Sequence, residues 1–105
     1  MEYELGEVIA ERVLAAKTKE GKSCEVSVLL GMPKPMPEAP YGDYYCPYLI
    51  RGVGPEKIGW AGGVDAIQAM QLAMVAIGAE LENHQRQLGL EIAWVDGSLG
   101  FPTRV

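Results

Sequence analysis

The sequence predicts an α+β fold, in which an antiparallel meander of four strands, or five, carries one long helix on one face. Residues 64–88 are strongly apolar with a helical period, whereas the chain before them consists of short alternating segments separated by turns. A single helix with one apolar stripe is expected to cover one face of a sheet. At 105 residues, the chain is expected to form a single domain, residues 1–105, with one core.

The first two predicted strands form a hairpin. Residues 8–16 and 23–30 flank a polar turn that contains Gly21, as hairpin turns often do. In the second of these strands, alternate positions are apolar and predict one buried face: Cys24, Val26, Val28 and Leu30.

The remaining strands are expected at residues 44–51, 57–61 and 90–95. In residues 44–51, one face consists of Tyr44, Cys46, Tyr48 and Ile50. Pro47 lies on the other face and has no N–H to donate, which indicates an edge position or a bulge. The two large side chains of residues 57–61 are expected to face the helix: Ile58 and Trp60. Residues 90–95 predict a fifth strand at an edge.

The predicted helix, residues 64–88, has an apolar stripe at alternating spacings of three and four. The stripe consists of Ile67, Met70, Met74, Ile77, Leu81, His84 and Leu88. Gly62 and Gly63 allow a sharp turn into the helix, Asp65 in its first turn suits the helix dipole, and Gly89 is placed to end it.

A second helix face is lined by small residues, among them Ala69, Ala73 and Ala76. A helix that is apolar on more than one side needs a second cover. We expect a second copy of the chain to supply it, which makes the protein a homodimer with these alanines in the interface. The alternative is that the tail from Asp96 onward covers this face.

Composition and charge exclude several classes of function. The formal net charge is −5, and the acidic residues are spread along the chain without a block of basic residues. Nucleic-acid binding is therefore not expected. Polar residues interrupt the helix, and the acidic start of the chain does not resemble a secretion signal, so we expect a cytoplasmic protein without a membrane span. Cys24 and Cys46 should then be reduced, and their spacing matches no zinc or redox motif.

Candidate catalytic residues are few. His84 is the only histidine, and Glu80 lies one helical turn before it. This pair could act in acid–base chemistry, but a partly buried structural histidine explains the pattern more simply. The glycines at 59–63 lack the Lys and Ser/Thr of a phosphate loop. We therefore expect no enzymatic activity, no cofactor and no metal site.

The proline-rich loop at residues 32–43 is the best candidate for a partner site. A loop of this length in a small domain suggests a function. Its side chains Met36 and Tyr41, together with Tyr45 on the following strand, are of types enriched in interfaces. The alternative is that the loop is a packed cover and that these side chains are buried.

Two segments carry a resemblance to a known family. They are Tyr45-Cys46-Pro47-Tyr48 and the run from Trp60 to Ala73, which includes Gly62-Gly63-Val64-Asp65-Ala66. These segments resemble a small bacterial family of uncharacterised single-domain proteins, a domain of unknown function. The resemblance implies a small bacterial domain and brings no activity or catalytic residue with it.

The function expected from the sequence is that of a small cytosolic binding or interaction protein without catalytic activity. Its partner would be itself, as a homodimer, or another protein. The alternative is a small-ligand-binding domain with an apolar pocket between helix and sheet, lined by Tyr48, Trp60 and Met74.

Overall fold

The computed structural model describes residues 3–37, 39–95 and 97–104. Six strands and one helix follow each other along the chain: β1 (Val8–Lys17), β2 (Ser23–Gly31), β3 (Lys34–Pro35), β4 (Tyr44–Arg51), β5 (Gly59–Gly63), α1 (Ala66–Leu88) and β6 (Glu91–Ala93). The five strands expected from the sequence are present, with small differences at their ends, and β3 is an additional short strand within the proline-rich loop.

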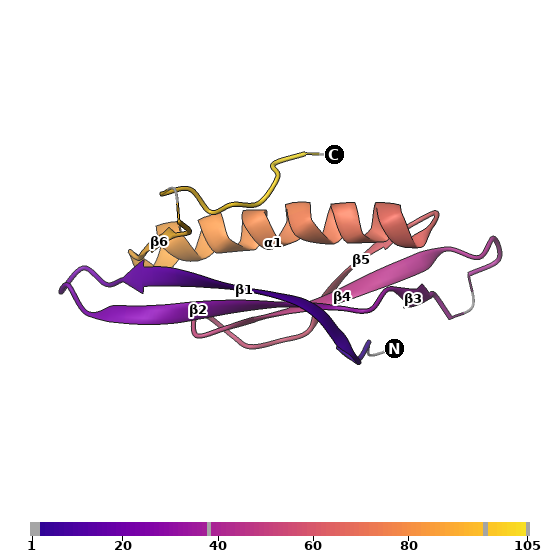
Figure 1. The fold of residues 1–105 in the computed structure, drawn as a ribbon, viewed down its shortest axis with the longest axis horizontal. Coiled ribbons are helices and arrows are strands. Elements are labelled where there is room, and N and C mark those ends of the chain that lie inside the picture. Colours follow the sequence, from indigo (N-terminus) through magenta and orange to yellow (C-terminus); the bar gives the residue numbers. More distant parts are fainter. Residues whose placement is uncertain (1–2, 38, 96, 105) are drawn as a thin grey trace.

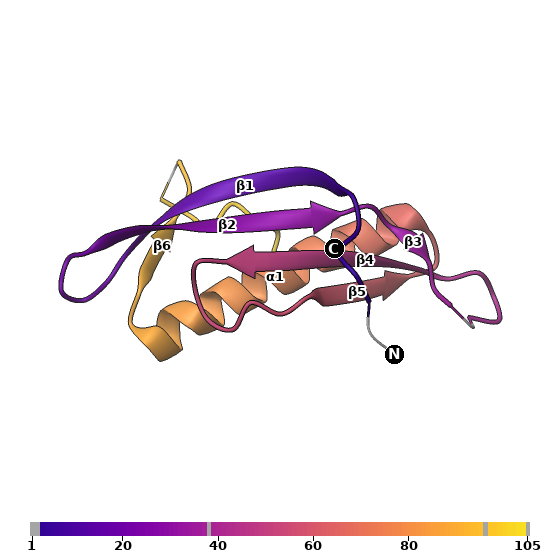
Figure 2. The same cartoon turned by 90° about the horizontal axis from the view of Figure 1, so that it is seen from below.

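The strands form one antiparallel sheet. β4 pairs with β2 and β5, β2 pairs with β1, and β6 pairs with β1 at the far edge. The helix α1 lies across one face of this sheet, which we call the inner face (Figures 1 and 2). The predicted α+β class, a meander with a fifth strand at its edge and one helix on one face, is confirmed.

Pro47 lies at an irregularity within β4 rather than at a sheet edge. β3 continues the line of β2 along β4, and residues 31–33 lie opposite residues 46–47 between the pairs Leu30–Tyr48 and Lys34–Tyr45. The strand line that faces Pro47 on the β2–β3 side is therefore broken, whereas on its other side Pro47 pairs with Trp60 of β5 in a continuous register. The structure agrees with the second of the two alternatives expected from the sequence.

Both ends of α1 are capped by residues that the sequence points to. Asp65 is the N-cap residue and accepts a hydrogen bond from the backbone N–H of Gln68 at 2.8 Å. It therefore lies just before the helix and not within its first turn, where the sequence placed it. Gly89 ends the helix in the left-handed conformation, with φ of 65°, and its N–H bonds to the carbonyl oxygen of Gln85.

The face of α1 that packs on the sheet matches the predicted stripe in part: Ile77 and Leu81 belong to both. Ala69, Ala73, Ile77 and Leu81 are fully buried, whereas Ile67 and Leu88 are exposed and Met74 is half-buried. Compared with the predicted stripe, the helix is rotated about its axis. The residues that face the sheet are spaced by four: Ala69, Ala73, Ile77 and Leu81. Met74 is not central to the core.

Small residues on β5 explain this rotation. Gly59, Ala61 and Gly63 alternate toward the helix, and a Cβ at Gly63 would lie 2.6 Å from the backbone nitrogen of Ala69. Because glycine and alanine meet here, helix and strand approach closely. The prediction that Ile58 and Trp60 face the helix is wrong: both are exposed, and Trp60 lies on the opposite, outer face.

The proposed dimer face is covered by the protein itself. Ala69 and Ala73 are 0% exposed within the core and therefore have no surface to offer a second copy, whereas Ala76 is half-buried against the core. The next side of the helix, at Gly78, is buried beneath the tail, where Phe101 would lie 3.2 Å from a Cβ at that glycine. The structure thus favours the alternative in which the tail covers the helix; Asp96, named as its first residue, lies outside the described residues.

The close contact between β5 and α1 predicts an asymmetry between two neighbouring glycines. Gly63→Ala should destabilise the protein by about 1–3 kcal/mol, because the new methyl group meets backbone atoms of the helix. Gly62→Ala on the same strand is the matched control, since its Cβ would meet only the flexible end of Met36, at 3.0 Å. Chemical denaturation of both variants measures the difference. Equal stabilities would show that the small-residue contact is not tight.

Candidate functional site

The outer face of the sheet holds a group of aromatic side chains in contact. The ring of Tyr3 lies 4.3 Å from that of Tyr45 and 4.5 Å from that of Trp60, between ring centroids, and both pairs are tilted. Met36 adjoins them, since a Cβ at Gly62 would have the methyl carbon of Met36 at 3.0 Å and the Trp60 ring at 3.6 Å. We call Tyr3, Met36, Tyr45 and Trp60 the outer aromatic surface.

The alternation of β4 and β5 places these residues together. Tyr44, Cys46 and Tyr48 point to the helix, so Tyr45 points outward, and Trp60 points outward from the neighbouring strand. The segment before β1 runs beside them, because the N–H of Met32 donates to the carbonyl oxygen of Glu7 at 2.8 Å and Gly31 adjoins Leu5. Tyr3 reaches Tyr45 by this route.

Tyr45 is consequently less accessible than the sequence suggests. It lies on the outer face, but only 8% of its surface is exposed. Tyr3 covers it, and Trp60, with 44% exposed, is the more accessible member of the surface. The sequence does not predict the position of Tyr3 or the outward direction of Trp60. Trp60 pairs with Pro47 of β4 and shares the outer face with it.

The proline-rich loop is partly packed and partly open. Its base is closed by a hydrogen bond from the N–H of Met36 to the carbonyl oxygen of Asp43 at 2.7 Å, and Met36 is half-buried. Tyr41, beyond this closure, is 89% exposed. Of the three residues expected to meet a partner, Met36 and Tyr45 lie together, whereas Tyr41 stands at the loop tip.

The acid–base candidates lie between helix and sheet. The hydroxyl of Tyr48 is hydrogen-bonded to Glu80, and burial, this hydrogen bond and the nearby negative charge raise the pKa of Tyr48 above its usual value. Gly59 leaves room for the Tyr48 ring, and the ring of His84 lies against Gly54. The rings of Tyr48 and His84 therefore each have a packing role, and the half-buried position of His84 fits the structural interpretation of this residue.

The C-terminal tail is fixed by a residue that the sequence analysis did not single out. The guanidinium group of Arg12 lies 3.8 Å from the ring centre of Trp94 and 4.9 Å from that of Phe101, and it donates a hydrogen bond to the carbonyl oxygen of Gly100. Stacking of arginine on two aromatic rings is attractive. Arg12 thereby links β1 to the tail.

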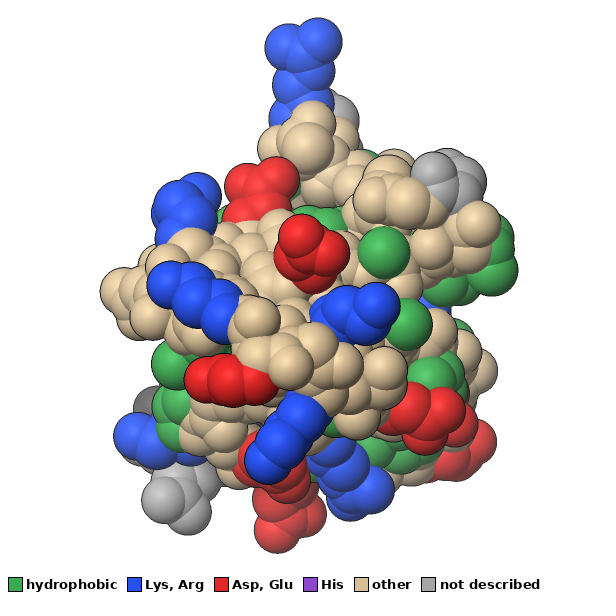
Figure 3. All heavy atoms as spheres, turned by 90° about the vertical axis from the view of Figure 1, so that its left-hand side faces the viewer, with side chains coloured by type: hydrophobic (Ala, Val, Ile, Leu, Met, Phe, Trp, Pro, Cys, Tyr) green, Lys and Arg blue, Asp and Glu red, His purple; other side chains and the backbone are tan. Residues whose placement is uncertain are grey.

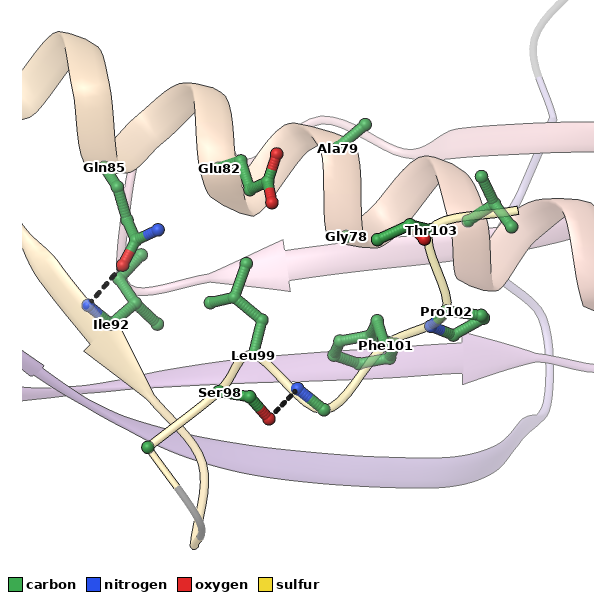
Figure 4. Close-up of a pocket in the computed structure, with 13 residues that line it drawn as sticks. Gly78, Ala79, Glu82, Gln85, Ile92, Ser98, Leu99, Phe101, Pro102 and Thr103 are labelled. Carbon is green, nitrogen blue, oxygen red and sulfur yellow. Dashed lines mark hydrogen bonds between the residues drawn. The ribbon is translucent and has the colours of Figure 1, made fainter.

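The largest of the described pockets is a groove between α1 and this tail, of about 450 Å³. Figure 4 shows Glu82 and Gln85 on its helix side and Leu99, Phe101 and Pro102 on its tail side. The side-chain oxygen of Gln85 accepts a hydrogen bond from the N–H of Ile92 at 2.9 Å, which orients that amide.

The pocket expected between helix and sheet has different walls. A cavity of about 180 Å³ lies there, lined by Met74 with residues of β1, β2 and the tail. Tyr48 and Trp60 do not line it: Tyr48 is buried beneath the helix, and Trp60 is on the outer face. The predicted lining is wrong because the outward direction of Trp60 was not foreseen.

The two cysteines occupy different environments. Cys24 is exposed near the β1–β2 turn, whereas Cys46 is buried and its thiol lies 3.5 Å from the carbonyl oxygen of Gly31. Burial raises the pKa of the Cys46 thiol from 9.0 to about 11. Only Cys24 is therefore open to reagents.

The surface charge is mixed. Figure 3 looks onto the end that holds the β1–β2 turn and shows basic and acidic side chains interspersed. Within the described residues, no three His, Cys, Asp or Glu side chains converge as a metal site would require. No helix in the described part of the chain is long and apolar enough to cross a membrane.

Fold and surface together define the class: a small α+β protein in which one helix covers a five-stranded meander, with aromatic side chains on the opposite face. The chain belongs to the family described as domain of unknown function DUF6968, whose model matches residues 10–103. The resemblance to a domain of unknown function, inferred from the sequence, is thereby confirmed. Searches of curated proteins and of solved structures found no match.

The contrast between the cysteines gives a test of the packing of β4. In the native protein, one thiol should react rapidly with a disulfide reagent at pH 8, and the second should react only on unfolding, because the thiolate is the reactive form and Cys46 is buried. Cys24→Ser should abolish the rapid phase and leave the slow one. Two equal rapid phases in the native protein would contradict the burial of Cys46.

Proposed function

We propose that this protein is a small bacterial, cytosolic binding protein without catalytic activity, and that another protein docks on its outer aromatic surface together with Tyr41. The observation behind this proposal is the exposure of Trp60 and Tyr41 at one end of the molecule, 44% and 89%, beside the packed rings of Tyr3 and Tyr45. Tyr and Trp are the residues that most often dominate binding energy in protein interfaces.

The geometry of this surface supports binding in a second way. Tyr45 is held between strand and N-terminal segment, and Trp60 is fixed on β5 by contact with Tyr3, so both rings are already ordered. Ordered aromatic groups lose little conformational entropy when a partner docks. Tyr41 on the loop supplies an adaptable contact beside these fixed ones.

We propose that the protein has no catalytic activity because of where its titratable side chains lie. His84 and Tyr48 pack against glycines, and His84 lines none of the three pockets described for the chain. A general base needs access to its substrate. The homodimer expected from the sequence would need another interface than Ala69, Ala73 and Ala76, so we propose a different protein as the partner.

A second candidate function, small-ligand binding, is favoured by the groove between α1 and the tail. Its volume of about 450 Å³ is within the range of ligand sites, and it combines apolar walls with Glu82 and Gln85. The groove is open to solvent on the tail side, and we rank it second.

Substitution at the two exposed aromatic residues tests the main proposal. The double variant Tyr41→Ala, Trp60→Ala should melt within a few degrees of the wild type, because both side chains are largely in solvent, and should lose the partner captured from source-cell extract. The matched control is Leu88→Ala, Val95→Ala, which removes two exposed apolar side chains elsewhere and should retain the partner. Equal capture by both double variants, or unfolding of the first, would refute the proposed site.

A further inference from the structure

The outer edge of β1 is free along most of its length. β1 pairs with β2 from Val8 to Lys17, but on its other side β6 covers only Ala15, Ala16 and Lys17. Figures 1 and 2 show no other strand or helix of the described chain beside the remaining part of this edge, and the C-terminal tail passes on its helix side, where Arg12 is hydrogen-bonded to Gly100. Alternate backbone groups of an edge strand point outward and can pair with a further strand.

The segment Ala10–Leu14 is the regular part of this free edge. The pairing with β2 is shifted between Val8 and Ala10, and from Ala10 onward the register is continuous. Ala10, Glu11 and Val13 are exposed, whereas β2 beneath them is mostly buried. Residues 10–14 contain no proline, and their two charged side chains are Glu11 and Arg12, of which Arg12 is held against the tail.

β6 forms one end of a slot for an added strand. β6 runs antiparallel to β1 and pairs Ala93 with Ala15, and the chain then turns away from the sheet. The turn is closed by hydrogen bonds from the N–H of Trp94 to Ser98 and from that of Gly97 to Trp94. A hollow of about 330 Å³ lies at this point, bordered by Val13, Leu14 and Ala15 on one side and residues 93–95 on the other.

The charges on the segment disfavour a second copy as the added strand. Two copies of β1 related by a two-fold axis would place one residue opposite itself. Centring the axis on Glu11 opposes two carboxylates, and centring it on Arg12 opposes two guanidinium groups; like charges at directly opposed positions are destabilising. If the axis is moved toward the start of β1, the paired segment includes the register shift before Ala10. If it is moved toward the end of β1, the second copy overlaps β6, which already pairs with Ala15.

We propose that the free edge at Ala10–Leu14 binds an extended segment of another protein as an additional antiparallel strand, with a Lys or Arg opposite Glu11 and a branched apolar side chain opposite Val13. Every strand pair of this sheet is antiparallel, and β6 already presents that direction. Glu11 and Val13 share the outer face, since they pair with Leu29 and Ser27 of β2, and Arg12 is engaged with the tail on the inner face. Charge complementarity at Glu11 selects the basic residue.

This site is separate from the outer aromatic surface, which lies on β4, β5 and the segment before β1. The proposal does not depend on that surface. A loss of binding at one site therefore leaves the other proposal intact.

A pair of synthetic peptides tests the edge directly. The probe is Thr-Val-Thr-Lys-Thr-Val-Thr with blocked ends, and the control peptide has Glu in place of Lys. Titrated into the wild-type protein, the Lys peptide should shift the backbone amide resonances of residues 10–14, slow their hydrogen exchange, and bind roughly two- to fivefold more tightly than the Glu peptide. No shift at millimolar peptide, or shifts confined to other segments, would overturn the proposal.

A charge reversal at Glu11 separates specific pairing from general attraction. Glu11→Lys should reverse the preference so that the Glu peptide binds more tightly. Glu20→Lys changes the net charge equally at an exposed position of the β1–β2 turn and should keep the preference of the wild type. An unchanged preference in Glu11→Lys would overturn the proposed register. Protection of residues 10–14 that rises with protein concentration in the absence of peptide would show that a second copy occupies the edge, and would overturn the proposed partner.

Discussion

The close contact between Gly63 of β5 and the first turn of α1 at Ala69 constrains how the helix packs on the sheet. A Cβ at Gly63 has no room beside Ala69, so the helix lies unusually close to β5. This closeness fixes the rotation of the helix, and the larger side chains Met70 and Met74 move to its flanks. At this point the backbones of β5 and α1 are in direct contact. This contact, and not the interlocking of large side chains, supplies the dispersion attraction and the burial that stabilise the packing.

Two further features follow from that rotation. Gly78 faces away from the sheet and is buried only because the tail packs on it, so the tail completes the core. The inner positions of β5 are all small, and its one large aromatic residue is therefore on the outer face, where it meets Tyr3. The candidate partner surface is thus a consequence of the tight packing on the other side of the same strand.

Strand positions, the helix ends and the meander could be predicted from alternation, turn residues and capping residues, because these signals are local. The rotation of the helix could not be predicted, since a stripe of large residues and a stripe of alanines competed, and the outcome depends on which of them packs on the assembled sheet. The same packing buries Ala69 and Ala73. Met36 and Tyr45 were correctly associated, but the burial of Tyr45 depends on Tyr3, which is far away in sequence.

Arg12 and Gly100 are 88 residues apart in the chain, and their contact has a consequence for the order of folding. The β1–β2 hairpin can form early because its contacts are local, whereas Arg12 stays without its aromatic partners until Trp94 and Phe101 have been synthesised. We therefore expect docking of the tail on Arg12 to follow formation of the hairpin, because contacts between residues far apart in sequence form more slowly than local ones.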